Sequence, residues 1–325
     1  MPRWLLPLLQ AAVSAILLGV LVTVVDWHAL RDAASALSGL TLLTVVLVCF
    51  CAQAMLVVRW RALLDLLGVR EPWTRSWHSV FAGLFLTNFL PGTLGSDGLR
   101  VVLLTKSCGR ASTAVGAIAY ERLMQLALYV VLATGAALVP MDGLPIWLRL
   151  AVVLCGGAGI TIVILVLYWL GNRSVAATGK PEGLIRATWN LLHRILIEVG
   201  RMQTKMRRHR LATWSFWLAS VSNIVGLVAI VEILLLERGS NPDIAAVALA
   251  ACASTVIGSL PISINGVGIY EASLTWLLTT AGVPTTDAIF TALMMRVLVM
   301  VVSVVGWPSL FVLRASVPAA QDRLG

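Results

Sequence analysis

Six charged residues stand within long apolar stretches of this 325-residue sequence, where they could form ion pairs or bind an anion. They are Asp97, Arg100, Glu121, Arg122, Glu271 and Arg296. A charged side chain is costly in the hydrocarbon of a membrane, so it usually faces the interior of a helical bundle. Pairs such as Asp97–Arg122 and Glu271–Arg296 would hold helices together. The arginines could also hold a phosphate group while the carboxylates balance or shuttle charge, and both uses can hold at once.

Two segments that break helices, Leu90–Gly98 and Leu260–Gly268, offer a second kind of binding group. Pro91 and Pro261 end the preceding helices because proline has no N–H to donate. The glycines that permit unusual backbone angles and close approach are Gly95, Gly98, Gly266 and Gly268. The helix after each break would begin with free N–H groups and a positive dipole end, which suits an anion such as phosphate. Hydrogen-bonding side chains near the breaks are Asn88, Thr93, Ser96, Ser263 and Asn265.

The composition requires that these groups be positioned inside a membrane protein. Hydrophobic residues make up 59% of the chain and charged residues 12%, with a mean hydropathy of +0.92. A soluble domain carries about 25% charged residues, so a soluble enzyme is excluded. The five cysteines and four histidines have no metal-ligand spacing, and no Gly-Lys-Ser/Thr nucleotide loop follows the glycines. We therefore expect no metal and no cofactor.

The apolar runs predict an all-α polytopic membrane protein with six full spans. A span needs about 20 apolar residues, and six stretches reach that length: Leu5–Val25, Leu37–Val58, Ser112–Val139, Leu148–Leu170, Leu211–Leu236 and Ala288–Leu313. Two further stretches, Trp77–Thr105 and Ile244–Ala281, contain the breaks. Their halves are too short to cross, at about 20 Å for 13 residues. They are predicted to be re-entrant helical hairpins, with two kinked but complete spans as the alternative.

The distribution of lysine and arginine predicts the orientation. The net charge of +9 is concentrated in a few segments between apolar runs, above all in Gly171–Arg210, which has nine Lys or Arg against Glu182 and Glu198. Such segments stay in the cytoplasm, so both termini are expected there. The basic excess also predicts contact with anionic headgroups of the inner leaflet, and it gives no reason to expect nucleic acid. The first apolar run follows Arg3 and could be mistaken for a signal peptide, but its length favours retention.

The chain reads as a single transmembrane domain, residues 1–325, built from two inverted halves near 37–139 and 211–313. Pro91 and Pro261 lie 170 positions apart, and the order of spans around them repeats with opposite sense. Residues 140–210 join the halves and include a predicted amphipathic cytoplasmic helix near 181–210. Interrupted segments at matching places in inverted halves indicate the central site of a transporter. Arg59 is expected at a helix end, with its side chain reaching toward lipid headgroups.

Three blocks of the sequence resemble a known family. They are Asn88–Arg100, with the pattern N-x-L-P…G-x-D-x-x-R, then Glu121-Arg122, and then Leu260-Pro261 followed by Asn265–Glu271. Together they are similar to the flippase-like transmembrane region of lysylphosphatidylglycerol synthases and its stand-alone bacterial and archaeal relatives, over nearly the whole chain. The sequence departs from the pattern at Ser96, usually glycine, and at Tyr270, often arginine. The chain ends at Gly325, so the aminoacyltransferase domain of two-part members is expected to be absent.

The resemblance implies movement of lipid between the leaflets of the cytoplasmic membrane. The leading interpretation is a flippase for an amphiphilic lipid, phosphate-bearing or isoprenoid, and not an enzyme. The expected partners are membrane lipids, with a homodimer possible. The alternative is a membrane-embedded enzyme or an accessory subunit of polyprenyl or hopanoid-type lipid biosynthesis. That alternative would need a catalytic acidic or metal constellation on the cytoplasmic side, which the loops do not supply.

Overall fold

The computed structural model describes residues 37–88, 94–141, 143–172, 184–260 and 266–315. Over these residues the chain is helical and contains no strand, so the predicted all-α class is confirmed. The helices are α3 (Gly39–Leu67), α4 (Trp73–Thr87), α5 (Leu94–Cys108), α6 (Ala111–Leu138), α7 (Ile146–Asn172), α8 (Leu184–Arg208), α9 (Arg210–Glu237), α10 (Ile244–Gly258), α11 (Ile269–Thr280), α12 (Thr285–Ser303) and α13 (Gly306–Ala315).

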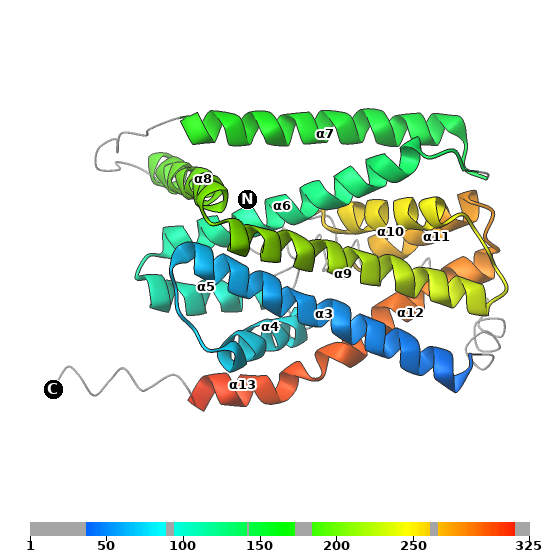
Figure 1. Ribbon diagram of the computed structural model, residues 1–325, viewed down its shortest axis with the longest axis horizontal. Coiled ribbons are helices and arrows are strands. Elements are labelled where there is room, and N and C mark those ends of the chain that lie inside the picture. Colours follow the sequence, from blue (N-terminus) through cyan, green and yellow to red (C-terminus); the bar gives the residue numbers. More distant parts are fainter. Residues whose placement is uncertain (1–36, 89–93, 142, 173–183, 261–265, 316–325) are drawn as a thin grey trace.

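Five segments of the described chain are long and apolar enough to cross a membrane. They are α3, α6, the first 18 residues of α7 (Ile146–Val163), α9, and the combined segment Thr285–Leu313. Each corresponds to a predicted span, and the remaining prediction, Leu5–Val25, lies outside the described residues. In Figure 1, α3, α6, α7 and α9 run along the long axis of the molecule. The protein is therefore an integral membrane protein.

Close packing of α3 against α9 forms the centre of the bundle. A Cβ added to Gly226 of α9 would lie 2.7 Å from the Cβ of Ala52 of α3, so glycine is needed for this approach. One turn away, Nδ2 of Asn223 donates to the Ala52 carbonyl oxygen at 2.8 Å. Hydrogen bonds of this kind between spanning helices hold them at a fixed register because no water competes for the donor. The close approach and the hydrogen bond together fix α9 against α3.

Two hairpins of short helices occupy opposite ends of the bundle (Figure 1). Helices α4 and α5 pack together so tightly that a Cβ on Gly95 would lie 2.7 Å from the Leu86 carbonyl oxygen. Helices α10 and α11 pack likewise, and a Cβ on Gly266 would lie 2.6 Å from the Gly258 carbonyl oxygen. Gly266 also has a φ of +69°, which favours glycine. The predicted role of glycine is confirmed at these two breaks.

Gly98 does not have the predicted role. It lies inside α5 without a positive φ, and an added Cβ would find no atom within 4 Å. Neither its backbone angle nor its surroundings require glycine. The prediction grouped Gly98 with the loop glycines because it follows Gly95 closely, but α5 has already begun at Leu94.

The last predicted span, Ala288–Leu313, is not one continuous helix. Helix α12 ends at Ser303, and α13 begins at Gly306 after a turn at Val304 and Val305. The break follows from Pro308, whose ring would clash with the carbonyl group of Val304 four residues earlier in a regular helix. Gly306 packs against the Phe81 carbonyl oxygen of α4 with no room for a side chain. This contact places α13 on α4.

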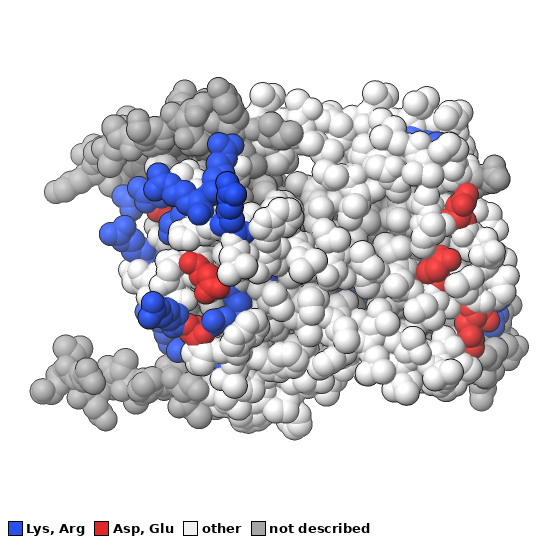
Figure 2. Space-filling model, viewed as in Figure 1, with Lys and Arg blue, Asp and Glu red and all other residues white. Residues whose placement is uncertain are grey.

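Charge divides the molecule along its long axis. Figure 2 shows most of the visible lysine and arginine side chains at one end and a group of acidic side chains at the other. Helix α8 brings Arg201, Lys205 and Arg207 to the basic end, and it buries Val199 and Met202 against the bundle. The amphipathic helix predicted near 181–210 is thus present over Leu184–Arg208. At the acidic end, Asp287 accepts from Nε of Arg238 at 3.0 Å.

Candidate functional site

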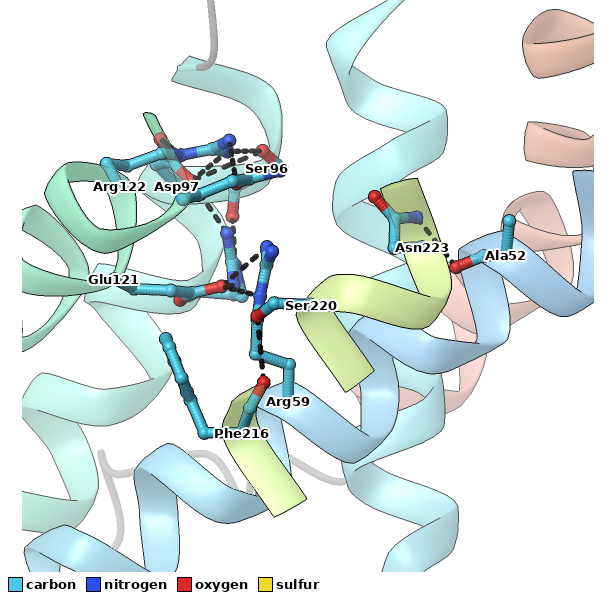
Figure 3. A network of polar contacts seen from close by, with 11 residues as sticks. Ala52, Arg59, Ser96, Asp97, Glu121, Arg122, Phe216, Ser220 and Asn223 are labelled. Atoms are coloured by element: carbon cyan, nitrogen blue, oxygen red, sulfur yellow. Dashed lines mark hydrogen bonds and ion pairs between the residues drawn. The ribbon is translucent and has the colours of Figure 1, made fainter. Parts of the chain in front are cut away.

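A fully buried carboxylate, Glu121 of α6, stands at the centre of the main polar network (Figure 3). From α3, Nε and Nη2 of Arg59 each lie 2.9 Å from its Oε1. From α5, Nη1 of Arg100 donates to both of its oxygens, at 3.2 Å and 3.0 Å. Both arginines are almost completely buried, so Glu121 joins three helices through charge-assisted hydrogen bonds.

A second carboxylate, Asp97, extends the network toward a more exposed arginine. Nη2 of Arg100 lies 2.7 Å from Oδ1 of Asp97. Arg122 binds both oxygens of Asp97, through Nη2 at 2.6 Å and Nε at 2.9 Å, and its Nη2 also lies 3.2 Å from the hydroxyl of Ser96. The Arg122 side chain is 32% exposed, against 6% for Arg100. Arg122 is therefore the arginine of this network that an incoming ligand would reach most readily.

The hairpin α10–α11 has a smaller polar cluster. Nε of Arg296 in α12 donates to Oε1 of Glu271 in α11 at 2.6 Å, and the guanidinium lies 5.9 Å from the centre of the Tyr270 ring. The other oxygen of Glu271 accepts from the backbone N–H of Gly268 at 2.7 Å. We expected the start of this helix to keep its N–H groups free for an anion. At Gly268 that expectation is wrong, because a carboxylate in the first turn takes the donor.

The two ion pairs have the same spacing. Asp97 and Arg122 are 25 residues apart, and so are Glu271 and Arg296. In each pair the acid lies in the first turn of the second hairpin helix, and the arginine lies in the long helix that follows. Both pairs were predicted from the depth of the charges in the sequence, and both are present. The matching positions differ by 174 residues, one helical turn more than the 170 that separate Pro91 and Pro261.

Arg59 was wrongly predicted to reach toward lipid headgroups. Helix α3 continues to Leu67 instead of ending near Val58, so Arg59 stands more than two turns before the end of the helix. Its side chain is 3% exposed and paired with Glu121. The sequence did contain a signal that the helix continues: most residues of Ala62–Leu67 are apolar, so the apolar stretch resumes after Arg59. Arg59 belongs to the site and was missed.

Among the remaining predicted site residues, the structure describes Asn88, which contacts a different helix end. Nδ2 of Asn88, at the end of α4, donates to the Ser303 hydroxyl at 2.6 Å and so ties the first hairpin to the end of α12. Thr93, Ser263 and Asn265 lie outside the described residues. Among the residues that the structure describes, no group of His, Cys, Asp or Glu is arranged to bind a metal ion.

A line of polar side chains on α6 continues from the first cluster along the helix. Nη1 of Arg122 lies 3.5 Å from Oε1 of Gln125. One turn further along, Tyr129 shares a hydrogen bond with Gln125. In the second cluster, Tyr270 lies under the guanidinium of Arg296, and its hydroxyl is buried without a hydrogen-bond partner among the described residues. The described hydrogen bonds therefore do not join the two clusters.

The sequence that forms these two clusters can be compared with known protein families. Residues 8–306 match the family described as the lysylphosphatidylglycerol synthase TM region. The chain belongs to this family. No curated protein matches it significantly. The family match spans both hairpins and every residue of the two ion-pair clusters, so Arg59, Glu121 and Arg296 all lie within the shared region.

Proposed function

We propose that this member of the lysylphosphatidylglycerol synthase TM family moves an amphiphilic lipid, phosphate-bearing or isoprenoid, between the two leaflets of the membrane. One observation carries the proposal: in each hairpin a carboxylate in the first turn of the second helix pairs with an arginine 25 residues later, in the long helix that follows. Charged groups inside a membrane protein usually mark a pathway for a polar substrate. Membership in a family of membrane regions supports a role in lipid handling, and we propose transport in preference to catalysis.

We also propose that α4–α5 and α10–α11 are re-entrant hairpins of two inverted halves. The longest of these helices has 15 residues, which at 1.5 Å per residue is about 22 Å. The hydrocarbon core is about 30 Å thick, so none of them crosses it alone. Their positions at opposite ends of the bundle support entry from opposite faces (Figure 1).

The orientation follows from the charge asymmetry. The end that carries α8 and most of the lysines and arginines faces the cytoplasm in this proposal, as the bias of basic residues favours. Both termini then lie in the cytoplasm, and the membrane is the cytoplasmic membrane of a bacterium or archaeon. The basic face of α8 would contact anionic headgroups of the inner leaflet.

The proposed mechanism is an exchange of anions on the arginines. In the described structure, the guanidinium of Arg122 is paired with Asp97, and that of Arg296 is paired with Glu271. A lipid phosphate that reaches Arg122 would displace Asp97, because a guanidinium binds phosphate and carboxylate with the same two-pronged geometry. The released carboxylate would have to be hydrated or protonated. Its need for water favours opening of the protein toward one face of the membrane. The same exchange at Arg296 would pass the headgroup to the opposite face.

Translocation of a fluorescent phospholipid in vesicles containing the purified protein tests the proposal. We expect the Arg122→Gln and Arg296→Gln variants to lose most of the transport rate at equal protein incorporation. The control is Arg201→Gln, since Arg201 is 60% exposed on α8 and pairs only with Glu198 among the described residues. Wild-type rates in both test variants would refute the mechanism. Those arginines would then be structural ion-pair partners.

A further inference from the structure

A further charged residue, Glu232, lies within the spanning helix α9 and belongs to neither ion-pair cluster. It stands seven residues after Val225 and fourteen after Leu218, so these three residues share one side of the helix. Val225 is 60% exposed and Leu218 is 69% exposed, which places this side toward lipid. Val231 and Leu234, on the other side of the same turn, are fully buried. Glu232 is therefore a carboxylate on the lipid-facing side of α9.

The carboxyl group of Glu232 has no partner among the described residues. Glu232 is half-buried, and its Oε2 is buried without a hydrogen bond. The helices that pack against α9 are α3, α6, α8, α10 and α12, and the charges of α8 lie at the basic end. Toward the acidic end, the titratable or charged residues on or beside these helices and α9 itself are Cys49, Cys51, Tyr129, Glu237, Arg238, Asp243, Cys252, Asp287 and Arg296. None of these groups acts on the Glu232 carboxylate.

A proton is the ligand that suits this position. A carboxylate that faces lipid needs water or a counter-charge, and the described residues supply no counter-charge. A proton removes the charge without requiring a second protein group. Water is close, because Glu232 precedes the last residue of α9, Glu237, by only five residues, or about 7.5 Å along the axis. The side chain can therefore exchange a proton with the aqueous phase at the acidic end.

This end of α9 is tied to the helix that carries the second ion pair. Nε of Arg238, the residue after α9, donates to Oδ1 of Asp287 at 3.0 Å, and the Ser240 hydroxyl donates to Oδ2 of the same carboxylate at 3.1 Å. Asp287 lies in the first turn of α12, and Arg296 follows nine residues later. A charge on Glu232 favours movement of the end of α9 toward water. The contacts with Asp287 would carry that movement to α12.

We propose that Glu232 is a proton-binding site, loaded from the aqueous phase at the acidic end, and that its protonation controls the rate of lipid movement. Proton binding follows from the position of Glu232 alone. Control of lipid movement rests on the proposed function, and in the proposed orientation the proton comes from the side opposite the cytoplasm.

Labelling with dicyclohexylcarbodiimide tests proton binding, because this apolar reagent adds to a protonated carboxyl group and not to a carboxylate. The purified full-length protein in neutral detergent is labelled over a series of pH values, and the modified residue is identified by peptide mass spectrometry. We expect Glu232 to be modified, at a rate that falls about tenfold per pH unit above its transition. The label should be lost in Glu232→Gln and kept in Glu237→Gln, the matched control at the exposed end of the same helix. An unlabelled Glu232, or labelling that does not change with pH, would overturn the proton site.

The melting temperature separates a proton site from a structural ion pair. Glu232→Gln resembles the protonated acid in shape and charge, and Glu232→Leu matches the apolar residues around it. Both variants should melt close to the wild-type temperature, because no described partner loses its counter-charge. A marked fall in the melting temperature of both variants would show that the carboxylate has a basic partner, which would refute proton binding.

Translocation in vesicles that hold the protein in one orientation tests the control of lipid movement. The wild-type rate should change severalfold with the pH on the side of the acidic end, whereas the rate of Glu232→Gln should stay constant. If Glu232 is labelled as expected and no lipid is translocated at any pH, the proton site stands and the proposed function fails. If wild type and Glu232→Gln translocate lipid with the same pH response, transport stands and control by Glu232 is refuted.

Discussion

Nε of Arg59 lies 2.9 Å from Oε1 of Glu121, and neither side chain has more than 3% of its surface exposed. The contact joins α3 to α6 across 62 positions of the chain. The same carboxylate also neutralises Arg100. Glu121 is therefore the group on which the positions of three helices depend.

Replacing Glu121 by glutamine should destabilise the protein strongly. The variant leaves Arg59 buried without its ion-pair partner and Arg100 paired with Asp97, and loss of one partner from a buried ion pair costs about 3–5 kcal/mol. We expect a large fall in folded yield and in melting temperature in detergent. The matched control is Glu198→Gln, whose partner Arg201 is mostly exposed, and its effect should be close to zero. Similar melting temperatures for the two variants would contradict the central role of Glu121.

Two glycines in α5 should respond differently to the same substitution. In Gly95→Ala the new Cβ would lie 2.7 Å from the Leu86 carbonyl oxygen, so α4 and α5 must separate. In Gly98→Ala the Cβ meets no atom within 4 Å, and alanine is the better helix former by about 0.5–1 kcal/mol. We expect a lower melting temperature for Gly95→Ala and an unchanged or higher one for Gly98→Ala. The reverse order would show that the hairpin packs differently.

The helix break after Ser303 gives a second matched pair. A side chain at Gly306 would collide with the Phe81 carbonyl oxygen, whereas one at Gly135 of α6 meets nothing within 4 Å. Gly306→Ala should therefore lower the melting temperature, and it should weaken the neighbouring contact between Nδ1 of His78 and the Ser309 hydroxyl, now 3.0 Å long. Gly135→Ala should be neutral or stabilising. Equal tolerance of both variants would argue against the close packing of α13 on α4.

Local patterns in the sequence predict much of this fold. Apolar runs of about 20 residues locate the spans, and proline with glycine locates the hairpins, because both signals act within a few residues. The pairs Asp97–Arg122 and Glu271–Arg296 were also predictable, since few charges are available inside the membrane and each needs a counter-charge. In both cases the physical constraint is strong and the number of alternatives is small.

Other features depend on packing that a single sequence does not reveal. Arg59 looked like the end of a span because a charge followed an apolar run, yet α3 continues and Glu121 of another helix supplies the counter-charge. The turn at Val304 and Val305 was hidden by an uninterrupted apolar run, although Pro308 gave a local signal for it. The carboxylate of Glu271 accepts a hydrogen bond from the start of its own helix, at Gly268, whose φ is +82°.

The pair Glu271–Arg296 offers the sharpest test of whether these arginines act in transport or only in structure. Each single substitution, Glu271→Gln or Arg296→Gln, leaves a partly or fully buried charge without the partner seen here and should reduce folded yield. The double variant removes both charges, so we expect much of the yield to return, because replacing a whole buried pair is often nearly neutral.

Transport by the double variant then decides between the two roles. If Arg296 binds the lipid phosphate, the double variant folds but translocates lipid at a small fraction of the wild-type rate. If Arg296 is only a structural partner of Glu271, transport recovers together with the yield. Folded yield by size-exclusion chromatography and translocation in vesicles at matched incorporation measure the two quantities separately. Recovery of both would remove Arg296 from the proposed pathway and leave Arg122 as the arginine that could receive the headgroup.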